Sequence, residues 1–289
     1  MLSYIEALEA LSQSGTMVEA ATLLRISQSA ISKRIASLEA RLGKKLIEKT
    51  GRRVQLTPHA LHLLTQLKPV LSEFRSILGA KIKSDSGVIS LGVSESILNS
   101  WGAELLHKIC KGWPELKLEV HTHRSPVVVD RVAAGEYQLG LIAGNADNSS
   151  SLRAIELLRE PMVLIPKNLG RIPSKWNGVG IITIESRSGT WGAIERRCND
   201  MGLIVERQLE SFFAVVQMSR AGFGHGLVPL GACTALGINE KSVHIFSAAK
   251  LSRPVCLVAR PSVLAQSTPA RFVDELQLKI KVLVQDFSN

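Results

Sequence analysis

The spacing of apolar residues near the start of the chain predicts two short helices separated by a break. Ile5, Leu8 and Leu11 recur at helical spacing, and Gly15 interrupts the pattern. The stretch from Thr16 to Glu19 then has the form of a capping box, in which a threonine starts the second helix and a glutamate reaches back to it. The second helix has small residues on its packing side.

A third helix, predicted to begin after the N-cap Ser27, has an apolar stripe and an unusual opposite face. The stripe consists of Ile31, Ile35, Leu38 and Leu42, in steps of 4, 3 and 4. The opposite face and its flanks carry hydroxyl, amide and cationic side chains, namely Gln28, Ser29, Ser32, Lys33 and Arg34. Two short helices joined by a three-residue turn form a helix-turn-helix, so this face is predicted to enter the major groove of double-stranded DNA. An amide can bond adenine there, and the cations suit guanine or phosphate.

Basic residues gather in the same region. The net charge of the chain is +10, and residues 25–53 hold nine Lys/Arg against two Glu, so most of the excess lies there. Such a patch attracts polyanions. Short apolar segments at 46–47 and 54–56 flank a turn at 50–53 and predict a β-hairpin wing. Lys49, Arg52 and Arg53 at its tip are placed to contact backbone phosphates.

A long helix is predicted after the hairpin, because Thr57-Pro58 has the form of a helix start. Apolar residues then step by 3, 4, 3 and 4 through Leu64, Leu67, Leu71, Phe74 and Leu78. This is a coiled-coil seam, and its simplest partner is a second copy of the chain; packing on the chain's own domain is the alternative. Pro69 is expected to kink the helix.

From residue 88 the pattern changes to alternating strands and helices. Strands are predicted at 88–93, 116–123, 138–143, 180–184, 205–209, 226–228 and 255–259, and helices at 97–111, 127–134, 191–201, 213–221 and 269–284. This order indicates two α/β units with mostly parallel sheets. The chain is predicted to cross between the units near 160 and 262, and the last helix to return to the first unit.

Three motifs of the N-terminal region fit one known pattern. They are Ala20-Ala21, the segment from Ser27-Gln28 to Ser32, and Leu38-Glu39 with Leu42-Gly43. On these residues the chain resembles a LysR-type transcriptional regulator, and the resemblance extends through the remaining length. Two places depart from the family pattern: Leu46-Ile47-Glu48-Lys49 replaces the usual Leu-Phe-x-Arg, and Ala60 stands where glycine is common. Neither touches the predicted reading face.

The resemblance implies an α/β protein with an α-rich winged helix-turn-helix domain over 1–57 and a dimerising linker helix over 58–86. The effector-binding domain over 87–289 then has two Rossmann-like subdomains, similar to periplasmic binding proteins: 87–160 with 263–289, and 161–262. A homodimer, assembling further into a homotetramer, would bind an interrupted palindrome near a promoter. A small-molecule effector in the cleft would change DNA bending and contact with RNA polymerase.

Ligands of such sheets lie beyond the carboxyl ends of the strands, facing helix N-termini. The residues predicted there are Ser94, Ser96, Arg124, Ser125, Ser188, Gly189, Thr190 and Phe212. Hydroxyls and backbone N–H groups at a helix start favour a small anion such as a carboxylate. Any single serine or threonine can instead serve only as an N-cap. Trp191 and His225 are further candidates for shaping the pocket, with core and turn roles as alternatives.

Several classes of function leave no signature in the chain. There is no nucleophile elbow, P-loop or dinucleotide-binding loop, so no enzyme activity, catalytic residue or cofactor is predicted. The four cysteines are scattered and the seven histidines form no ligand pattern, which favours reduced core thiols over a redox role for Cys198 and predicts no metal site. No apolar run of about 18 residues and no signal peptide appear, so a cytoplasmic protein without membrane contact is expected. The alternative function is an intracellular small-molecule receptor without sequence-specific DNA binding.

Overall fold

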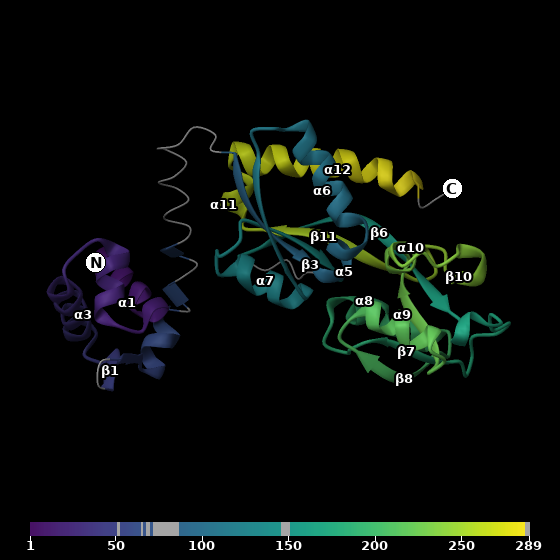
Figure 1. Ribbon diagram of the computed structural model, residues 1–289, viewed down its shortest axis with the longest axis horizontal. Helices are drawn as coiled ribbons and strands as arrows, with labels where there is room; N and C mark the ends of the chain where they lie inside the picture. Colours follow the sequence, from purple (N-terminus) through teal and green to yellow (C-terminus); the bar gives the residue numbers. More distant parts are fainter. Residues whose placement is uncertain (51–52, 65, 68–69, 72–86, 146–150, 287–289) are drawn as a thin grey trace. The chain divides into compact units, whose positions relative to one another are not determined.

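The computed structural model describes residues 1–50, 53–64, 66–67, 70–71, 87–145 and 151–286 (Figure 1). The chain forms two compact units, 1–74 and 75–289. Each unit has its own hydrophobic core and is described by itself. No helix of the described ranges is both long enough and apolar enough to cross a bilayer.

The N-terminal unit is a three-helix cluster with a hairpin. Its elements are α1 (Leu2–Ser14), α2 (Met17–Leu24), α3 (Gln28–Leu42), β1 (Ile47–Thr50) and β2 (Arg53–Leu56), followed by helical residues at 58–64, 66–67 and 70–71. The predicted stripe of α3 is buried at Ile31, Ile35 and Leu38, whereas Leu42 is 40% exposed and does not join the core. The winged helix-turn-helix is therefore confirmed, with a shorter stripe than the sequence indicated.

The predicted helix starts and the hairpin are formed as expected. The Thr16 hydroxyl accepts a hydrogen bond from the Glu19 N–H at 3.2 Å, and that of Ser27 accepts from the Ala30 N–H at 3.2 Å. Strands β1 and β2 are antiparallel, with Ile47 opposite Leu56. These local signals fix the turn between α2 and α3, which sets the direction of the α3 face.

Glu39 joins the end of α3 to the hairpin. Its carboxylate accepts the N–H of Leu46 at 2.8 Å and of Ile47 at 3.3 Å, and it pairs with the Lys45 ammonium at 3.0 Å. Burial opposes the charged form of this carboxyl, but the three donors together outweigh burial and hold the pKa of Glu39 below its ordinary value. The glutamate of the Leu38-Glu39 motif thus attaches the hairpin to the end of α3.

The C-terminal unit is built on one continuous nine-stranded sheet, in the order β4-β3-β5-β11-β6-β9-β7-β8 with β10 paired to β6. The strands are β3 (Val88–Ser94), β4 (Lys117–His123), β5 (Leu139–Ala143), β6 (Arg153–Ile165), β7 (Gly180–Ile184), β8 (Ile204–Leu209), β9 (His225–Pro229), β10 (His244–Ile245) and β11 (Ser252–Ala259). Strands β3, β4 and β5 are parallel, as are β7, β8 and β9, and β11 is antiparallel to β5 and β6. The two predicted α/β units are therefore confirmed as the two ends of one sheet.

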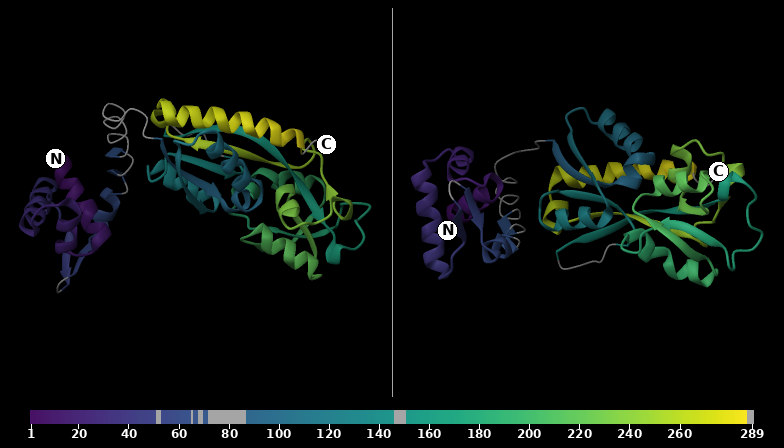
Figure 2. Two further views of the ribbon diagram at one scale, coloured as in Figure 1. Left: turned by 45° about the horizontal axis from the view of Figure 1, so that its top comes forward. Right: turned by 60° about the horizontal axis from the view of Figure 1, so that its bottom comes forward.

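Helices cover both faces of the sheet. They are α5 (Glu95–Ile97), η1 (Leu98–Gly102), α6 (Ala103–Gly112), α7 (Ser125–Ala133), α8 (Gly189–Asp200), α9 (Phe212–Arg220), α10 (Leu230–Ala235), α11 (Pro261–Leu264) and α12 (Ser267–Asp286), with short 3-10 turns η2 (Lys167–Leu169) and η3 (Glu240–Ser242). In the first subdomain α6 and α12 lie on one face and α7 on the other (Figures 1 and 2). Strand β11 shows why: Val255 and Leu257 join the α6–α12 core, and Cys256 and Val258 join the α7 core.

The structure corrects one crossover between the subdomains. The crossover expected near 160 lies within β6, where residues 153–161 pair with β11 and Met162 pairs with Pro229 of β9. The crossover expected near 262 lies instead just before β11, because Leu251 packs in the core of the second subdomain and Val255 in that of the first. Strand β11 therefore belongs to the first subdomain, and α12 returns to it as expected.

The helix predicted over 97–111 is broken near its start. Ser100 has non-helical backbone angles (φ −112°, ψ −109°). Its hydroxyl donates to the carbonyl groups of Ser96 at 2.7 Å and Ile97 at 3.1 Å, which competes with regular helical bonding. The break turns the neighbouring Trp101 toward a buried charge pair described below.

Candidate functional site

The outward face of α3 presents the predicted polar side chains. Gln28, Ser29, Ser32 and Lys33 are all exposed. The remaining candidate, Arg34, is half-buried and its guanidinium donates a long hydrogen bond of 3.4 Å to the Ser3 carbonyl of α1. The exposed part of the candidate surface is thus an amide, two hydroxyls and one ammonium, and Arg34 lies on its flank.

For the three basic residues of the hairpin, the structure describes the backbone of two and the side chain of none. Lys49 and Arg53 belong to β1 and β2, which places them beside the turn as predicted, but their side chains lie outside the described part of the chain. Arg52 also lies outside the described residues. Their role as phosphate contacts stays a prediction.

The first residue of the predicted dimer seam packs inside its own domain. Leu64 is 4% exposed and packs in the core of the N-terminal unit with α1, α2 and α3. Leu71 is buried and Leu67 half-buried, whereas Phe74 and Leu78 lie outside the described residues. A helix that packs on its own domain has the same 3–4 spacing as a coiled coil, and Leu64 follows that alternative.

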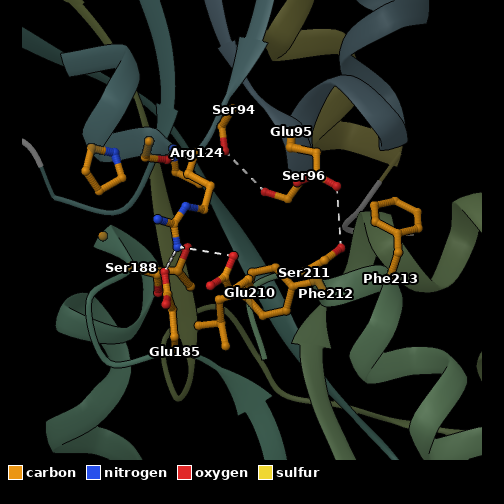
Figure 3. Close-up of a pocket in the computed structure, with 16 residues that line it drawn as sticks. Ser94, Glu95, Ser96, Arg124, Glu185, Ser188, Glu210, Ser211, Phe212 and Phe213 are labelled. Carbon is orange, nitrogen blue, oxygen red and sulfur yellow. Dashed lines mark hydrogen bonds and ion pairs between the residues drawn. The ribbon is translucent and has the colours of Figure 1, made fainter. Parts of the chain in front are cut away.

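A cavity with about 480 Å³ of empty space lies between the two subdomains of the C-terminal unit (Figure 3). The ends of β3 and β5, the starts of α5 and α7, and Arg124 after β4 supply one wall. The end of β7 and the segments that lead into α8 and α9 supply the other. All eight predicted effector residues line it: Ser94, Ser96, Arg124, Ser125, Ser188, Gly189, Thr190 and Phe212. The rule that places ligands beyond the strand ends thus located the cavity correctly. Trp191 packs in the core, and His225 begins β9; neither is among the lining residues.

Hydrogen bonds hold the hydroxyl groups of one wall in place. The Ser125 hydroxyl donates to the Ser94 oxygen at 3.2 Å and accepts the Ala143 N–H at 3.0 Å, so it joins α7 to β3 and β5. On the other wall Ser188 caps α8, where its oxygen accepts the Trp191 N–H at 3.0 Å. These two hydroxyls are therefore occupied by the fold itself.

Three carboxylates also line the cavity, and the sequence interpretation missed them. Arg124 of the first subdomain forms an ion pair with Glu185 of the second, and its Nη1 lies 3.9 Å from a carboxylate oxygen of Glu210. Glu95 faces them across the cavity (Figure 3). Each of these glutamates directly follows the carboxyl end of a strand, where ligands of such sheets are expected. The sequence therefore contained the information needed to predict them.

A buried ion pair lies directly beneath the cavity. Arg253 and Glu160 are both 0% exposed, and Nε and Nη2 of the arginine donate to one carboxylate oxygen at 2.8 and 2.7 Å. The arginine's Nη1 also donates to the Ser96 hydroxyl at 2.8 Å, and its guanidinium lies 5.4 Å from the Phe212 ring centre. Two lining residues, one from each subdomain, therefore contact the same buried cation.

The two subdomains also approach each other closely at a pair of glycines. Gly144 has φ +107°, and a Cβ there would overlap the carbonyl group of Gly189 at the start of α8. Only glycine allows both this backbone conformation and this approach. The contact brings the residue after β5 against the start of α8, where Gly189 lines the cavity.

The cysteines show no sign of reactivity. Burial raises the pKa of the Cys198 and Cys233 thiols to about 12 and that of Cys256 to about 11, and it also raises the pKa of Cys110. A thiol that stays protonated is a weak nucleophile, so these environments favour core packing over redox sensing. Among the described residues, no three or more His, Cys, Asp and Glu side chains are grouped so as to hold a metal ion.

Comparison with protein families decides between the candidate classes. Residues 2–61 match the model of the bacterial regulatory helix-turn-helix protein, lysR family, and residues 83–279 match that of the LysR substrate binding domain. The chain belongs to the LysR family. This LysR-type protein is a DNA-binding transcription regulator with a helix-turn-helix domain and an effector-binding domain, in a family of regulators rather than enzymes.

Similar proteins agree with this assignment over nearly the whole chain. A helix-turn-helix transcriptional regulator of Vibrio cholerae is 29% identical over 267 residues, which cover 91% of this chain and 90% of the relative. A full-length OxyR variant from Pseudomonas aeruginosa has the same fold, with a TM-score of 0.70 at 18% identity and 97% of each chain covered. CbnR in complex with its target DNA matches with a TM-score of 0.64 at 18% identity, covering 96% of this chain and 99% of that one.

Proposed function

We propose that this LysR-type regulator binds an interrupted palindrome at promoters as a dimer or tetramer and responds to a small effector, with an anionic group, in its C-terminal cavity. The observation that carries the DNA-binding part is the exposed α3 face, on which Gln28, Ser29, Ser32 and Lys33 stand clear of the core. Small polar side chains let a helix approach base edges closely, and an amide can make a bidentate contact with adenine.

The effector part rests on the cavity between the subdomains. Its lining combines hydroxyls, helix starts and two phenylalanines, which is the mixture of polar and apolar groups that small-molecule sites use. The described lining holds no histidine, cysteine or lysine, so serine hydroxyls there have none of these groups beside them as a base. The hydroxyls, helix starts and apolar surface together support a small-molecule binding site.

Coupling between the two parts needs an effector that binds two arrangements of the assembly unequally. We propose that the effector changes the width of the cleft, that the helix after the hairpin transmits this change, and that the DNA-binding heads are respaced. The altered DNA bending then changes contact with RNA polymerase. The support is the position of the cavity, which is lined by residues of both subdomains.

A binding-site selection with the full chain tests the DNA-binding role. Duplexes recovered from a random-sequence pool are expected to share an interrupted palindrome. Gln28→Ala should then lose discrimination at the position it reads, by about 1–3 kcal/mol per base contact. Gln13→Ala removes the same side chain from an exposed position on α1 and serves as the matched control.

Two results would contradict the proposal. If Gln28→Ala kept the full preference among sites, the base-reading role of that residue would be wrong. If the wild-type chain showed no affinity for duplex DNA even at low salt, the alternative of a small-molecule receptor without sequence-specific DNA binding would be favoured.

A further inference from the structure

The cavity is more acidic than a site for a simple anion should be. Its described lining holds three carboxylates, Glu95, Glu185 and Glu210, against the single guanidinium of Arg124. Arg124 is already paired with Glu185 across the two walls. An anion that approached this arginine would have to displace a carboxylate and would meet two more.

Two of these carboxylates lack a full cationic partner within the described residues. Glu95 accepts only a long hydrogen bond of 3.4 Å from the Ser211 hydroxyl. The Glu210 oxygen lies 3.9 Å from an arginine that is bonded more closely elsewhere. The two side chains face the same space from opposite subdomains (Figure 3). A cationic group placed between them would relieve their repulsion.

The start of α8, in contrast to the acidic part of the cavity, offers groups that favour a negative charge. Thr190 lines the cavity and is 3% exposed, yet its hydroxyl makes no hydrogen bond to any described residue. The hydroxyl of the neighbouring Ser188 is occupied by the helix cap. The Thr190 hydroxyl oxygen is not itself fully enclosed, so it is open to the cavity and available to a ligand. The first-turn N–H groups of the same helix favour a negative charge there.

These two poles define the ligand class. We infer that the effector of the proposed regulator is a small zwitterion, whose ammonium group lies between Glu95 and Glu210 and whose carboxylate lies at Thr190. Phe212 and Phe213 supply apolar surface for the rest of the molecule. The inference rests on the proposed function and narrows it to amino-acid-like ligands.

The test uses matched probes that differ by one charged group. The full chain is titrated by calorimetry with each of the common α-amino acids, with the corresponding acids that lack the amino group, and with the corresponding amines that lack the carboxylate. At least one amino acid is expected to bind, and its two single-charge analogues are expected to bind about tenfold or more weakly.

Variants then separate the two poles. Glu95→Gln should weaken the amino acid about tenfold or more and leave unchanged, or strengthen, the acid that lacks the amino group. Thr190→Val should weaken both carboxylate-bearing probes and leave the amine unchanged. Glu115→Gln, which removes an exposed carboxyl outside the cavity, should change neither. A merely structural role of Glu95 would weaken both probes together.

The outcomes that overturn the inference are distinct from failure of the proposed function. Binding of an acid that lacks the amino group, as tight as that of its amino acid and unchanged in Glu95→Gln, would overturn the zwitterion. Binding of none of the amino acids would overturn it as well. In either case, sequence-specific DNA binding by the same preparation would leave the regulator in place, whereas its absence would count against the regulator.

Discussion

The buried pair of Arg253 and Glu160 gives the sharpest prediction on stability. Both side chains are fully buried where β6 and β11 pass between the subdomains. One carboxylate oxygen accepts two arginine N–H groups, and the other accepts the Gly231 N–H at 2.9 Å and the Trp101 indole N–H at 3.3 Å. A Cβ on Gly231 would come within 2.7 Å of that second oxygen, so glycine is needed for this approach. Glu160 therefore accepts four hydrogen bonds, two from the arginine and two from groups that bond only to its other oxygen.

The expected magnitudes follow from leaving one charge alone in the interior. Arg253→Met strands a buried carboxylate, and Glu160→Gln strands a buried guanidinium, so each should lower the free energy of unfolding by about 3–5 kcal/mol. The double variant removes both charges and keeps an amide oxygen to accept from Gly231 and Trp101. Its cost should be no more than about 2 kcal/mol. The two single costs are thus strongly non-additive.

Denaturant unfolding followed by tryptophan fluorescence measures this on the full chain. All four tryptophans lie in the C-terminal unit, so the N-terminal unit contributes no signal: Trp101, Trp113, Trp176 and Trp191. Arg271→Met, which removes a guanidinium that lies over Trp113 on the exposed side of α12, is the matched control and should cost under about 1 kcal/mol. Single variants within about 1 kcal/mol of the wild type, or a double variant as costly as the sum of the singles, would refute the reasoning.

Two further predictions concern pH and the hairpin. The Lys167 N–H donates to Nδ1 of His225 at 3.2 Å, and burial holds the pKa of His225 below its ordinary value of 6.5, so its contribution to stability is present above that pH and lost as the pH falls. His225→Gln should cost about 1 kcal/mol near neutral pH and flatten the pH dependence of the unfolding midpoint, whereas the exposed His107→Gln should change neither. Glu39→Gln should destabilise the N-terminal unit by about 1.5–3 kcal/mol in thermal unfolding followed by circular dichroism, because hydrogen bonds to a charged carboxylate are lost. That cost should be present above the ordinary carboxyl pKa and vanish as the pH falls through the lowered pKa, and an equal cost in Glu48→Gln would contradict the assignment.

The position of the cavity was predictable because it depends on local signals. Ser94 ends a strand, Ser125, Ser188 and Phe212 follow strands, and each begins or precedes a helix. Parallel strands bring such positions to one edge of a sheet. The carboxylates of the cavity were missed, since the sequence interpretation attended to hydroxyls and backbone N–H groups. Glu95 stands directly beside one of those serines in the sequence, so its presence at the cavity could have been predicted.

Features that depend on long-range packing were not predictable in the same way. Arg253 and Glu160 are 93 residues apart, and nothing in the sequence pairs these two charges. The apolar sequence of β11 predicts a buried strand but does not show which subdomain the strand joins. The second crossover was therefore predicted after β11, near residue 262. Leu64 has the spacing of a coiled-coil seam, but this spacing serves equally well for a helix on its own core, where the structure places it.

The buried pair and the cavity are joined through shared residues, and this has a consequence for effector response. Ser96 lines the cavity and accepts from Arg253, so a ligand group that bonds the Ser96 hydroxyl acts on an atom that also holds the buried cation. Strand β6 runs through both subdomains and β11 begins at the other crossover, so any change in cleft width must be absorbed near the positions of Glu160 and Arg253. Because a charge pair in the interior tolerates little separation, we expect the network to resist intermediate widths and to favour a small number of discrete arrangements. An effector then alters the regulator only to the extent that its contacts differ between those arrangements.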